Sequence, residues 1–407
     1  MFFILIILFH IFGSNDISKE EIFSYFEEYN IYSPFPDTNS IKNITFYYEN
    51  IIKNFINQTY LNYNENPLIT VIIPIYNGNK YILRALLSIE AQTFKNIEIL
   101  YIDDYSTDNS TEIIQILQKI DKKIRLVKNK ENKGILFTKS LGVKYAKGKY
   151  TISMDQDDIY INKNLFSELF NISEKNDLDI IQYKSINYYL KNNKLVFERD
   201  LIPPNYNKII KQPKLGNIRY FLKEEHFKSY FLWDKLIKKE IYLKALNLIG
   251  EEQLNKKIVH REDHIAMFYL YKVANKYMRI NLYGYLHIYG YEQQSSIYYF
   301  DTRDGKNVSD EIKETILRDQ FEFFKFIYLR TNNINSEKYA CVKQIILITK
   351  NLSFCIKVKN NEIRNLVIDV CKMYLKLNFI SLGKKTIIED FLKKFIEMNN
   401  ELINHDL

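Results

Sequence analysis

From residue 67 onward, short apolar runs alternate with stretches in which apolar residues recur at helical spacing. The apolar runs that predict strands cover 68–73, 97–102, 124–127 and 150–154. Between them, apolar positions three and four residues apart predict helices over 81–92, 110–120 and 135–146. This alternation predicts an α/β fold in which helices flank a mostly parallel sheet. We expect Ser110 or Thr111 to cap the second helix, because a side-chain oxygen there can accept a hydrogen bond from a free backbone N–H.

Polar residues directly follow three of the predicted strands. These polar clusters lie at 74–79, 103–108 and 155–158. Ligands of open parallel sheets bind beyond the carboxyl ends of the strands, and all three clusters lie at such ends. The sequence therefore predicts a single ligand site along this edge of the sheet.

The last of these clusters, Asp155-Gln156-Asp157-Asp158, carries three carboxylates. Side chains two residues apart in an extended segment share a face, so Asp155 and Asp157 can point into one cavity, while we expect Asp158 to be structural. Two adjacent carboxylates repel each other unless a cation lies between them. Carboxylate and phosphate oxygens suit Mg²⁺ or Mn²⁺, so the cluster predicts a divalent metal site that holds a phosphorylated ligand. A solvated turn after a strand is the alternative.

Four segments resemble, in order and spacing, the family 2 glycosyltransferases of the GT-A fold. They are Val-Ile-Ile-Pro-Ile-Tyr-Asn at 71–77, Tyr-Ile-Asp-Asp-Tyr-Ser-Thr-Asp-Asn-Ser-Thr at 101–111, Asn-Lys-Gly at 132–134 and Met-Asp-Gln-Asp-Asp at 154–158. The resemblance covers roughly 68–290 and implies a GT-A (Rossmann-like) domain, which we place at 67–295. It also implies an enzyme that moves a sugar from a nucleotide-sugar donor to an acceptor hydroxyl with inversion. The acceptor class, whether glycan, protein or lipid, stays open.

The resemblance also implies roles for individual residues. Pro74 and Tyr76 would line the nucleobase pocket, and Asp104 would accept a hydrogen bond from the base, which favours uridine. Asp155 would contact the ribose or the metal, and Asp157 would bind the Mn²⁺ or Mg²⁺ that bridges the two phosphates.

Two positions depart from the family pattern. Lys139 stands where relatives commonly have an Arg-Asn pair, and it keeps the positive charge for the diphosphate without the fork of Arg. Tyr105 replaces the usual Gly of the second motif.

The second half of the chain contains the candidate residues that would activate the acceptor hydroxyl. Glu262 and Asp263 precede an apolar helical run at 265–273 and resemble the family's catalytic pair, which makes Asp263 the general base and Glu262 an orienting residue. The helix macrodipole favours acidic residues at this position without any catalysis. His287 is a candidate third metal ligand, with a buried, hydrogen-bonded histidine as the alternative. Trp233 is either the floor of the sugar or acceptor site or a core residue.

The chain ends suggest additions to this domain. Met1 to Phe12 is apolar and uncharged, too short for a membrane-spanning helix and typical of a signal-peptide core, although a basic N-terminal region is missing. We therefore expect a signal peptide or short anchor at 1–13, with a buried N-terminal helix as the alternative. A helical stem would occupy 14–66. A helical region at 305–407 is predicted from periodic segments at 308–330, 338–350, 361–377 and 385–402.

Composition adjusts this interpretation in small ways. Aromatic residues make up 15% of the chain, and the net charge of +8 is spread over single lysines, which suits an anionic ligand. The sequence carries no nucleic-acid-binding or zinc-binding signature. Asn-X-Ser/Thr sequons give mild support for the secretory pathway (ER or Golgi lumen, or weakly membrane-associated), and they lie at Asn43, Asn57, Asn109, Asn171, Asn307 and Asn351. The sequon at Asn109 lies within the second motif and is discounted as a glycosylation site.

Two further functions compete with the transferase. One is a catalytically inactive module on the same fold that binds a nucleotide-sugar or a glycan. The other is a sugar nucleotidyltransferase, which would need a Gly-rich basic loop near the first strand that 74–80 does not contain.

Overall fold

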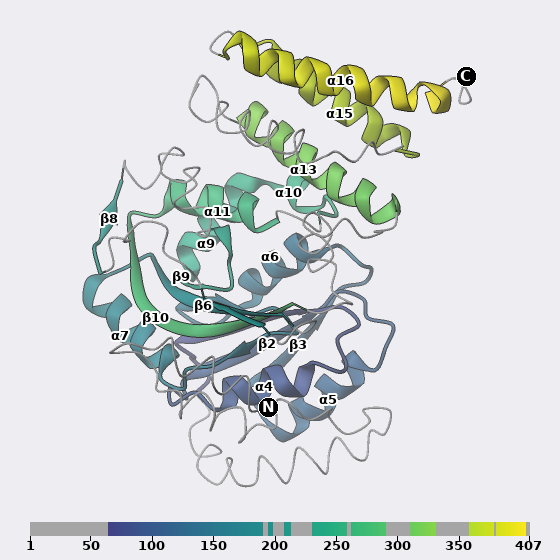
Figure 1. Cartoon of the computed structure of the whole chain (residues 1–407). Coiled ribbons are helices and arrows are strands. Elements are labelled where there is room, and N and C mark those ends of the chain that lie inside the picture. Colours follow the sequence, from purple (N-terminus) through teal and green to yellow (C-terminus); the bar gives the residue numbers. More distant parts are fainter. Residues whose placement is uncertain are drawn as a thin grey trace. The chain divides into compact units, whose positions relative to one another are not determined.

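The computed structural model describes residues 64–189, 194–197, 207–212, 230–258, 262–289, 310–330, 358–377 and 380–403 (Figure 1). The expected signal segment at 1–13, most of the expected stem at 14–66 and the expected helix at 338–350 lie outside these residues. The chain divides into two compact units. The second unit holds 217–227, 258–265 and 291–407, and the first holds the rest of the chain.

The first unit is built on one sheet with strand order β3-β2-β1-β4-β9-β6-β10-β5. Its strands are β1 (Ile69–Ile75), β2 (Ile97–Asp103), β3 (Ile124–Lys128), β4 (Tyr150–Ser153), β5 (Ile159–Tyr160), β6 (Ile180–Tyr189), β7 (Lys194–Phe197), β8 (Ile210–Lys211), β9 (Lys235–Lys238) and β10 (Lys276–Tyr289). Strands β3, β2, β1 and β4 are mutually parallel, β9 runs antiparallel to β4 and β6, and β6 and β10 are parallel. The four-strand part predicted from the sequence is therefore parallel, within a larger mixed sheet.

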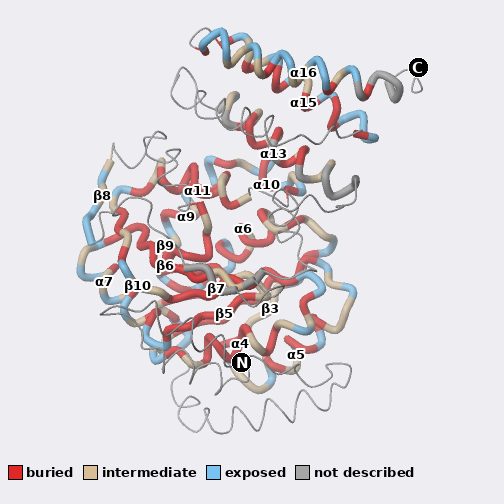
Figure 2. Tube along the Cα trace, viewed as in Figure 1, coloured by how far each residue is buried: buried red, intermediate tan, exposed pale blue. Residues whose placement is uncertain are grey.

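Helices cover both faces of this sheet (Figure 1). They are α4 (Ile82–Glu90), α5 (Ser110–Ile120), α6 (Ile135–Tyr145), α7 (Leu165–Asn176), α9 (Lys239–Ile249), α10 (Glu251–Leu254) and α11 (Glu262–Val273), whose first residues belong to the second unit. Apolar residues of α4, α5 and α7 share one buried cluster with β1, β2 and β4. Helix α6 packs on β1 and β2 from the other side, next to α9. Figure 2 shows the central strands as largely buried, as near-continuous apolar runs require.

The predicted cap of α5 is wrong. Helix α5 does begin at Ser110, but its N-cap residue is Asn109, whose side chain makes no capping hydrogen bond. The Ser110 hydroxyl accepts a hydrogen bond from the Gly78 backbone instead, and the Thr111 hydroxyl donates to Asp103. The partners of these two side chains lie at the ends of β1 and β2. A capping rule considers only neighbours in the sequence, so it does not anticipate such partners.

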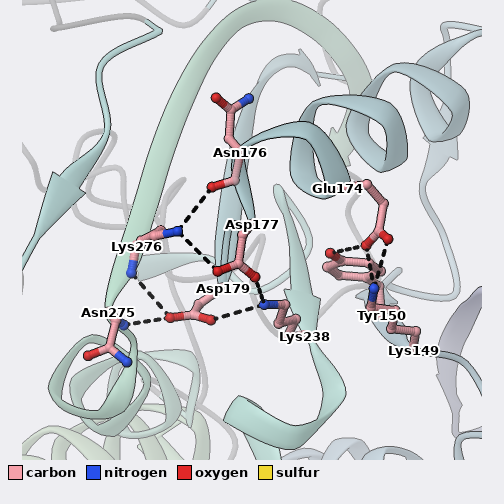
Figure 3. Close-up of polar contacts among 9 residues, drawn as sticks. All are labelled: Lys149, Tyr150, Glu174, Asn176, Asp177, Asp179, Lys238, Asn275 and Lys276. Carbon is pink, nitrogen blue, oxygen red and sulfur yellow. Dashed lines mark hydrogen bonds and ion pairs between the residues drawn. The ribbon is translucent and has the colours of Figure 1, made fainter.

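At the edge opposite the carboxyl strand ends, charged side chains join the start of β6 to the end of β9 and the start of β10 (Figure 3). The Asp177 carboxylate lies 2.6 Å from Lys238 Nζ and 3.0 Å from Lys276 Nζ. The Asp179 carboxylate accepts hydrogen bonds from the backbone N–H groups of Asn275 and Lys276. This network holds strands that lie far apart in the sequence in register.

The second unit contains the described C-terminal helices α13 (Asp310–Arg330), α15 (Asn361–Leu375) and α16 (Leu382–Ile403). Their bounds agree closely with the helical periodicity of the sequence. Helix α15 packs against both α13 and α16, and the Asn360 side chain caps α15 through the N–H groups of Glu362 and Ile363. Within the described residues, none of the helices combines the length and the apolarity that crossing a membrane requires.

Candidate functional site

The site begins where β4 ends and the chain turns through Asp155 to Asp158. The Asp158 carboxylate is fully buried and accepts hydrogen bonds from the Tyr285 hydroxyl at 2.7 Å and the Ile288 N–H at 2.8 Å. His287 Nδ1 lies 2.8 Å from the same carboxylate. Asp158 therefore ties the carboxylate turn to β10, in agreement with its expected structural role.

His287 is held as a cation by this arrangement. Burial would lower the pKa of its imidazole, but the adjacent Asp158 carboxylate outweighs burial and raises that pKa to about 9. The ring stacks on Trp233, with ring centroids 5.2 Å apart, and Trp233 also stacks on Tyr285 at 4.9 Å. These contacts favour the alternative interpretation for both residues: His287 is a buried, hydrogen-bonded histidine, and Trp233 is a core residue.

The expected metal-binding set of Asp155, Asp157 and His287 does not form as three converging ligands. Among the residues that the structure describes, no group of three or more His, Cys, Asp or Glu side chains is arranged to hold a metal ion. Protein carboxylates at this edge would therefore supply only part of a coordination shell, and a ligand's phosphate oxygens would have to supply the rest.

The Asp157 and Asp155 carboxylates nevertheless lie in unfavourable electrostatic surroundings, as expected of clustered carboxylates. Desolvation, together with the charges of Asp158 and Asp155, raises the pKa of Asp157 to about 8. Asp155 Oδ1 is buried and accepts no hydrogen bond from the described residues, although Lys139 Nζ lies 3.3 Å away. An additional cation next to these oxygens would stabilise the charged form of Asp157 and would interact with Asp155 Oδ1.

Lys139 comes from α6 and is almost completely buried. Its ion pair with Asp155 brings two of the predicted site residues together. Tyr285 adds a second support, because its hydroxyl accepts a hydrogen bond from the Asp155 N–H at 3.1 Å while it donates to Asp158. The orientation of Asp155 thus depends on α6 and β10 as well as on its own strand.

The predicted base-binding residues lie at the ends of β1 and β2. Pro74 is buried within β1 opposite Ile102 of β2, and the Tyr76 side chain, just beyond the strand, is 45% exposed. The Asp104 carboxylate accepts hydrogen bonds from Asn129 Nδ2 and from the backbone N–H groups of Lys133 and Gly134. A carboxylate has about four acceptor positions, so Asp104 keeps about one for a ligand while it fixes the start of α6.

Sequence reasoning missed Gln156, which joins the first and last motifs. Its side-chain oxygen accepts a hydrogen bond from the Tyr76 N–H at 3.0 Å, and its side-chain nitrogen donates to the Tyr76 carbonyl at 3.2 Å. A Cβ atom at Gly78 would lie 2.3 Å from Gln156 Oε1, so only glycine leaves room for this side chain. The glycine at position 78 of the first polar cluster was the available sequence signal for this contact. The side chain that requires a glycine there belongs to Gln156, 78 residues further along the chain.

Arg84 is a second residue that sequence reasoning missed. It lies on α4 and donates a hydrogen bond of 2.6 Å to the Asp157 backbone carbonyl. Burial lowers the pKa of its guanidinium, while the Asp157 and Asp158 carboxylates oppose that shift. Arg84 therefore fixes the backbone of the carboxylate turn from the face of the sheet that α4 covers.

Glu262 and Asp263 form the first turn of α11, as predicted, and the Asp263 side chain is buried. Both residues belong to the second compact unit. The carboxylates that follow β4 belong to the first unit.

Comparisons with known proteins bear on this site. Residues 70–233 match the family model described as Glycosyl transferase family 2. Glycosyltransferase GlyG of Streptococcus pneumoniae is 36% identical over 121 residues, which is 30% of this chain and 40% of GlyG. The UDP-Glc:alpha-D-GlcNAc-diphosphoundecaprenol beta-1,3-glucosyltransferase WfgD of Escherichia coli is 28% identical over 183 residues, which is 42% of this chain and 70% of WfgD.

Among solved structures, S. aureus TarS 1-349 in complex with UDP-GlcNAc matches with a TM-score of 0.53 at 16% identity. The match covers 83% of this chain and 92% of that chain, and at this identity it concerns the fold. Several curated relatives, GlyG among them, are matched over only about 40 to 52% of their own length.

Proposed function

We propose that this chain, which belongs to the family 2 glycosyltransferases and has their GT-A fold, transfers a sugar from a UDP-sugar to an acceptor hydroxyl with inversion at the anomeric carbon. The observation that carries the proposal is the group of Asp155, Asp157 and Lys139 at the carboxyl end of β4. It combines crowded carboxylates with a buried cation at the edge where ligands of such sheets bind.

A divalent cation fits this group. Its charge would offset the burial and the repulsion that raise the pKa of Asp157, and it would add a second cation to the Lys139 that faces Asp155 Oδ1. We propose that Asp157 holds Mn²⁺ or Mg²⁺, with Asp155 shared between the metal and the ribose. Such an ion would supply Lewis-acid stabilisation of the departing nucleoside diphosphate. Lys139 would orient Asp155 and add positive charge next to the diphosphate.

A uridine nucleotide fits the other end of the site. The exposed Tyr76 ring offers a stacking surface, and Asp104 keeps about one acceptor position for the N–H of a base imide. The names of the relatives point the same way, since WfgD is described as using UDP-Glc and TarS was solved with UDP-GlcNAc. We propose UDP-linked donors for this chain on these grounds.

For the acceptor step we propose Asp263 as general base, with Glu262 orienting the acceptor. Asp263 would take the proton of the acceptor hydroxyl as its oxygen bonds to the anomeric carbon. The bond from that carbon to the phosphate oxygen breaks on the opposite face, and UDP leaves with the bonding electrons. WfgD is named for a lipid-linked acceptor, so a lipid-linked glycan, reached through weak membrane association of residues 1–13, is our first candidate for the acceptor.

Titration calorimetry of UDP with and without Mn²⁺ tests the donor site. We expect Mn²⁺-dependent binding by the wild type, and loss of that dependence in Asp157→Asn because one anionic ligand of the metal is removed. Metal-independent binding of equal strength would contradict the proposed metal site. Asp158→Asn is not a suitable control, because Asp158 holds β10 in place.

A second experiment separates the transferase from a binding module on the same fold. We expect Asp263→Asn to abolish sugar transfer while it leaves UDP affinity within about twofold of the wild type, because a general base acts on the acceptor and not on the donor. A wild-type protein that binds UDP-sugars but neither hydrolyses nor transfers any of them would favour the binding module.

A further inference from the structure

Tyr105 adopts a backbone conformation that does not suit a tyrosine. Its φ angle is +68°, in the left-handed region that L-residues other than Gly, Asn and Asp rarely occupy. Its side chain is nevertheless 48% exposed, so burial of the ring offsets little of this strain. A strained residue with an exposed aromatic ring contributes little to folding, which directs attention to what the ring could contact outside the protein.

The strained conformation is held by specific contacts. The Asp103 carboxylate accepts a hydrogen bond of 2.8 Å from the Ser106 N–H, which spans Tyr105 from one side to the other. On the strand side, the Asp104 N–H donates to the Ile75 carbonyl at 2.8 Å. Tyr105 is therefore fixed between two anchored neighbours, and its ring emerges from a defined position.

The loop that carries Tyr105 is bonded to the loop that carries Tyr76. Strands β1 and β2 are parallel neighbours, with Ile75 opposite Asp103, so the residues that follow them leave the sheet at the same edge. The two loops are joined, because the Asn77 N–H donates to Ser106 Oγ at 3.0 Å and the Thr107 N–H donates to Asn77 Oδ1 at 2.8 Å. Two exposed tyrosines are thus carried by one pair of interlocked loops.

We propose that Tyr105 supplies a second aromatic contact to the base of the bound nucleoside diphosphate, in addition to that of Tyr76. This inference rests on the proposed function. A planar base can be contacted by one ring on its face and by another on its second face or edge, and every base offers such surfaces. Tyr105 therefore strengthens the binding of the nucleoside and adds nothing to the binding of the diphosphate.

The proposal predicts effects of opposite sign on stability and affinity. Tyr105→Gly removes the strain and the ring together, so its midpoint of urea unfolding should rise while its affinity for UDP in the presence of Mn²⁺ falls by about tenfold. Tyr105→Phe keeps the ring and should bind UDP within about twofold of the wild type. A structural role for Tyr105 would instead lower stability in the glycine variant.

Inorganic pyrophosphate with Mn²⁺ provides the matched probe without a base. Calorimetry should give the same pyrophosphate affinity for the wild type and Tyr105→Gly, because the ring contacts only the nucleoside. Asn207→Gly is the control variant: Asn207 also has a positive φ angle, of +59°, but it follows no strand at the carboxyl edge of the sheet. It should leave both affinities unchanged.

Three results would overturn the inference. The first is a Tyr105→Gly variant that binds UDP as tightly as the wild type. The second is an equal loss of UDP and pyrophosphate affinity, which would mean that the substitution deformed the loops. The third is a wild type that binds Mn²⁺-pyrophosphate but shows no preference for UDP. A wild type that binds neither refutes the proposed function itself.

Discussion

The side-chain amide of Gln156 forms hydrogen bonds with both backbone polar groups of Tyr76, 80 residues earlier in the chain. The amide thus pairs with Tyr76 as a neighbouring strand would, at the point where β1 has ended and its ladder stops. It connects the loop that carries the Tyr76 ring with the turn that carries Asp155 and Asp157. The two ends of the proposed donor site are therefore held at a fixed spacing by one side chain.

Gly78→Ala should break this connection. The added methyl group would lie 2.3 Å from Gln156 Oε1 and displace the amide, because a flexible side chain yields before the backbone does. We expect a loss of about 1 kcal/mol in the free energy of unfolding, the typical net value of such hydrogen bonds, measured by urea denaturation. The affinity for UDP with Mn²⁺ should fall in parallel.

A double-mutant cycle makes this prediction specific. In a Gln156→Ala background the clash is absent, so Gly78→Ala should cost close to nothing there. Equal costs in both backgrounds would show that Gly78 is required for another reason. Gly383→Ala is the control, since a Cβ atom at that position meets no atom within 4 Å and alanine is the better helix former.

Asp158→Asn should be among the most destabilising single changes in the first unit. It removes the carboxylate that is hydrogen-bonded to His287 and leaves the buried imidazolium with only the more distant charges of Asp155 and Asp157. Breaking one partner of a buried ion pair typically costs about 3–5 kcal/mol, which urea denaturation would measure. Tyr285→Phe removes only one hydrogen bond to Asp158 and should cost about 1 kcal/mol. Similar small costs for both variants would argue against a charged His287.

The stability of the first unit should depend on the protonation of His287. Its pKa in the folded protein, about 9, lies above the ordinary value of 6.5. The folded state therefore binds this proton more tightly than the unfolded state does, so the contribution is complete below about pH 6.5 and is lost as the pH rises through 9. The difference in unfolding free energy between the wild type and His287→Gln should shrink over that range. A difference that is constant with pH would contradict the assignment.

The contribution of Asp177 to stability should be lost at acidic pH. Its hydrogen bonds to Lys238 and Lys276 lower the pKa of its carboxyl group to about 2. A lowered pKa means that the stabilisation is present above the ordinary value of 3.8 and is lost as the pH falls towards 2. Asp177→Asn should be slightly less stable at neutral pH and equal to the wild type near pH 2, by thermal unfolding. Asparagine tolerates the φ angle of +51°, so the backbone is not a separate cause.

Salt provides the check on this network. Because the Asp177 side chain is largely exposed, ions in solution screen its charge effectively. The difference between the wild type and Asp177→Asn should therefore diminish at high salt. A difference that persists would assign the effect to hydrogen-bond geometry instead of charge.

The periodicity of the sequence was sufficient to predict the strands and helices of the first half of the sheet and to place Asp155 and Asp157 at its carboxyl edge. Apolar runs and helical spacing predicted β1 to β4 and α4 to α6 to within two residues at each end, because these patterns are local and reflect which faces are buried. The same alternation places Asp155 and Asp157 at the carboxyl edge of the sheet, since parallel strands must end together. The four motifs then gave the resemblance to the family 2 glycosyltransferases, whose family model matches residues 70–233.

Tertiary structure decided which groups satisfy one another. The sequence interpretation offered His287 as a metal ligand or as a buried, hydrogen-bonded histidine, and the fold places the Asp158 carboxylate, from 129 residues away, against its Nδ1. In the same way, Gln156 reads as an unremarkable polar residue until Tyr76 and Gly78 are placed next to it. Buried polar groups need partners, and strand order chooses those partners from distant parts of the chain. The local sequence determines on which element, and on which face of it, a side chain lies. The tertiary fold determines which groups that side chain contacts, because those groups come from distant parts of the chain.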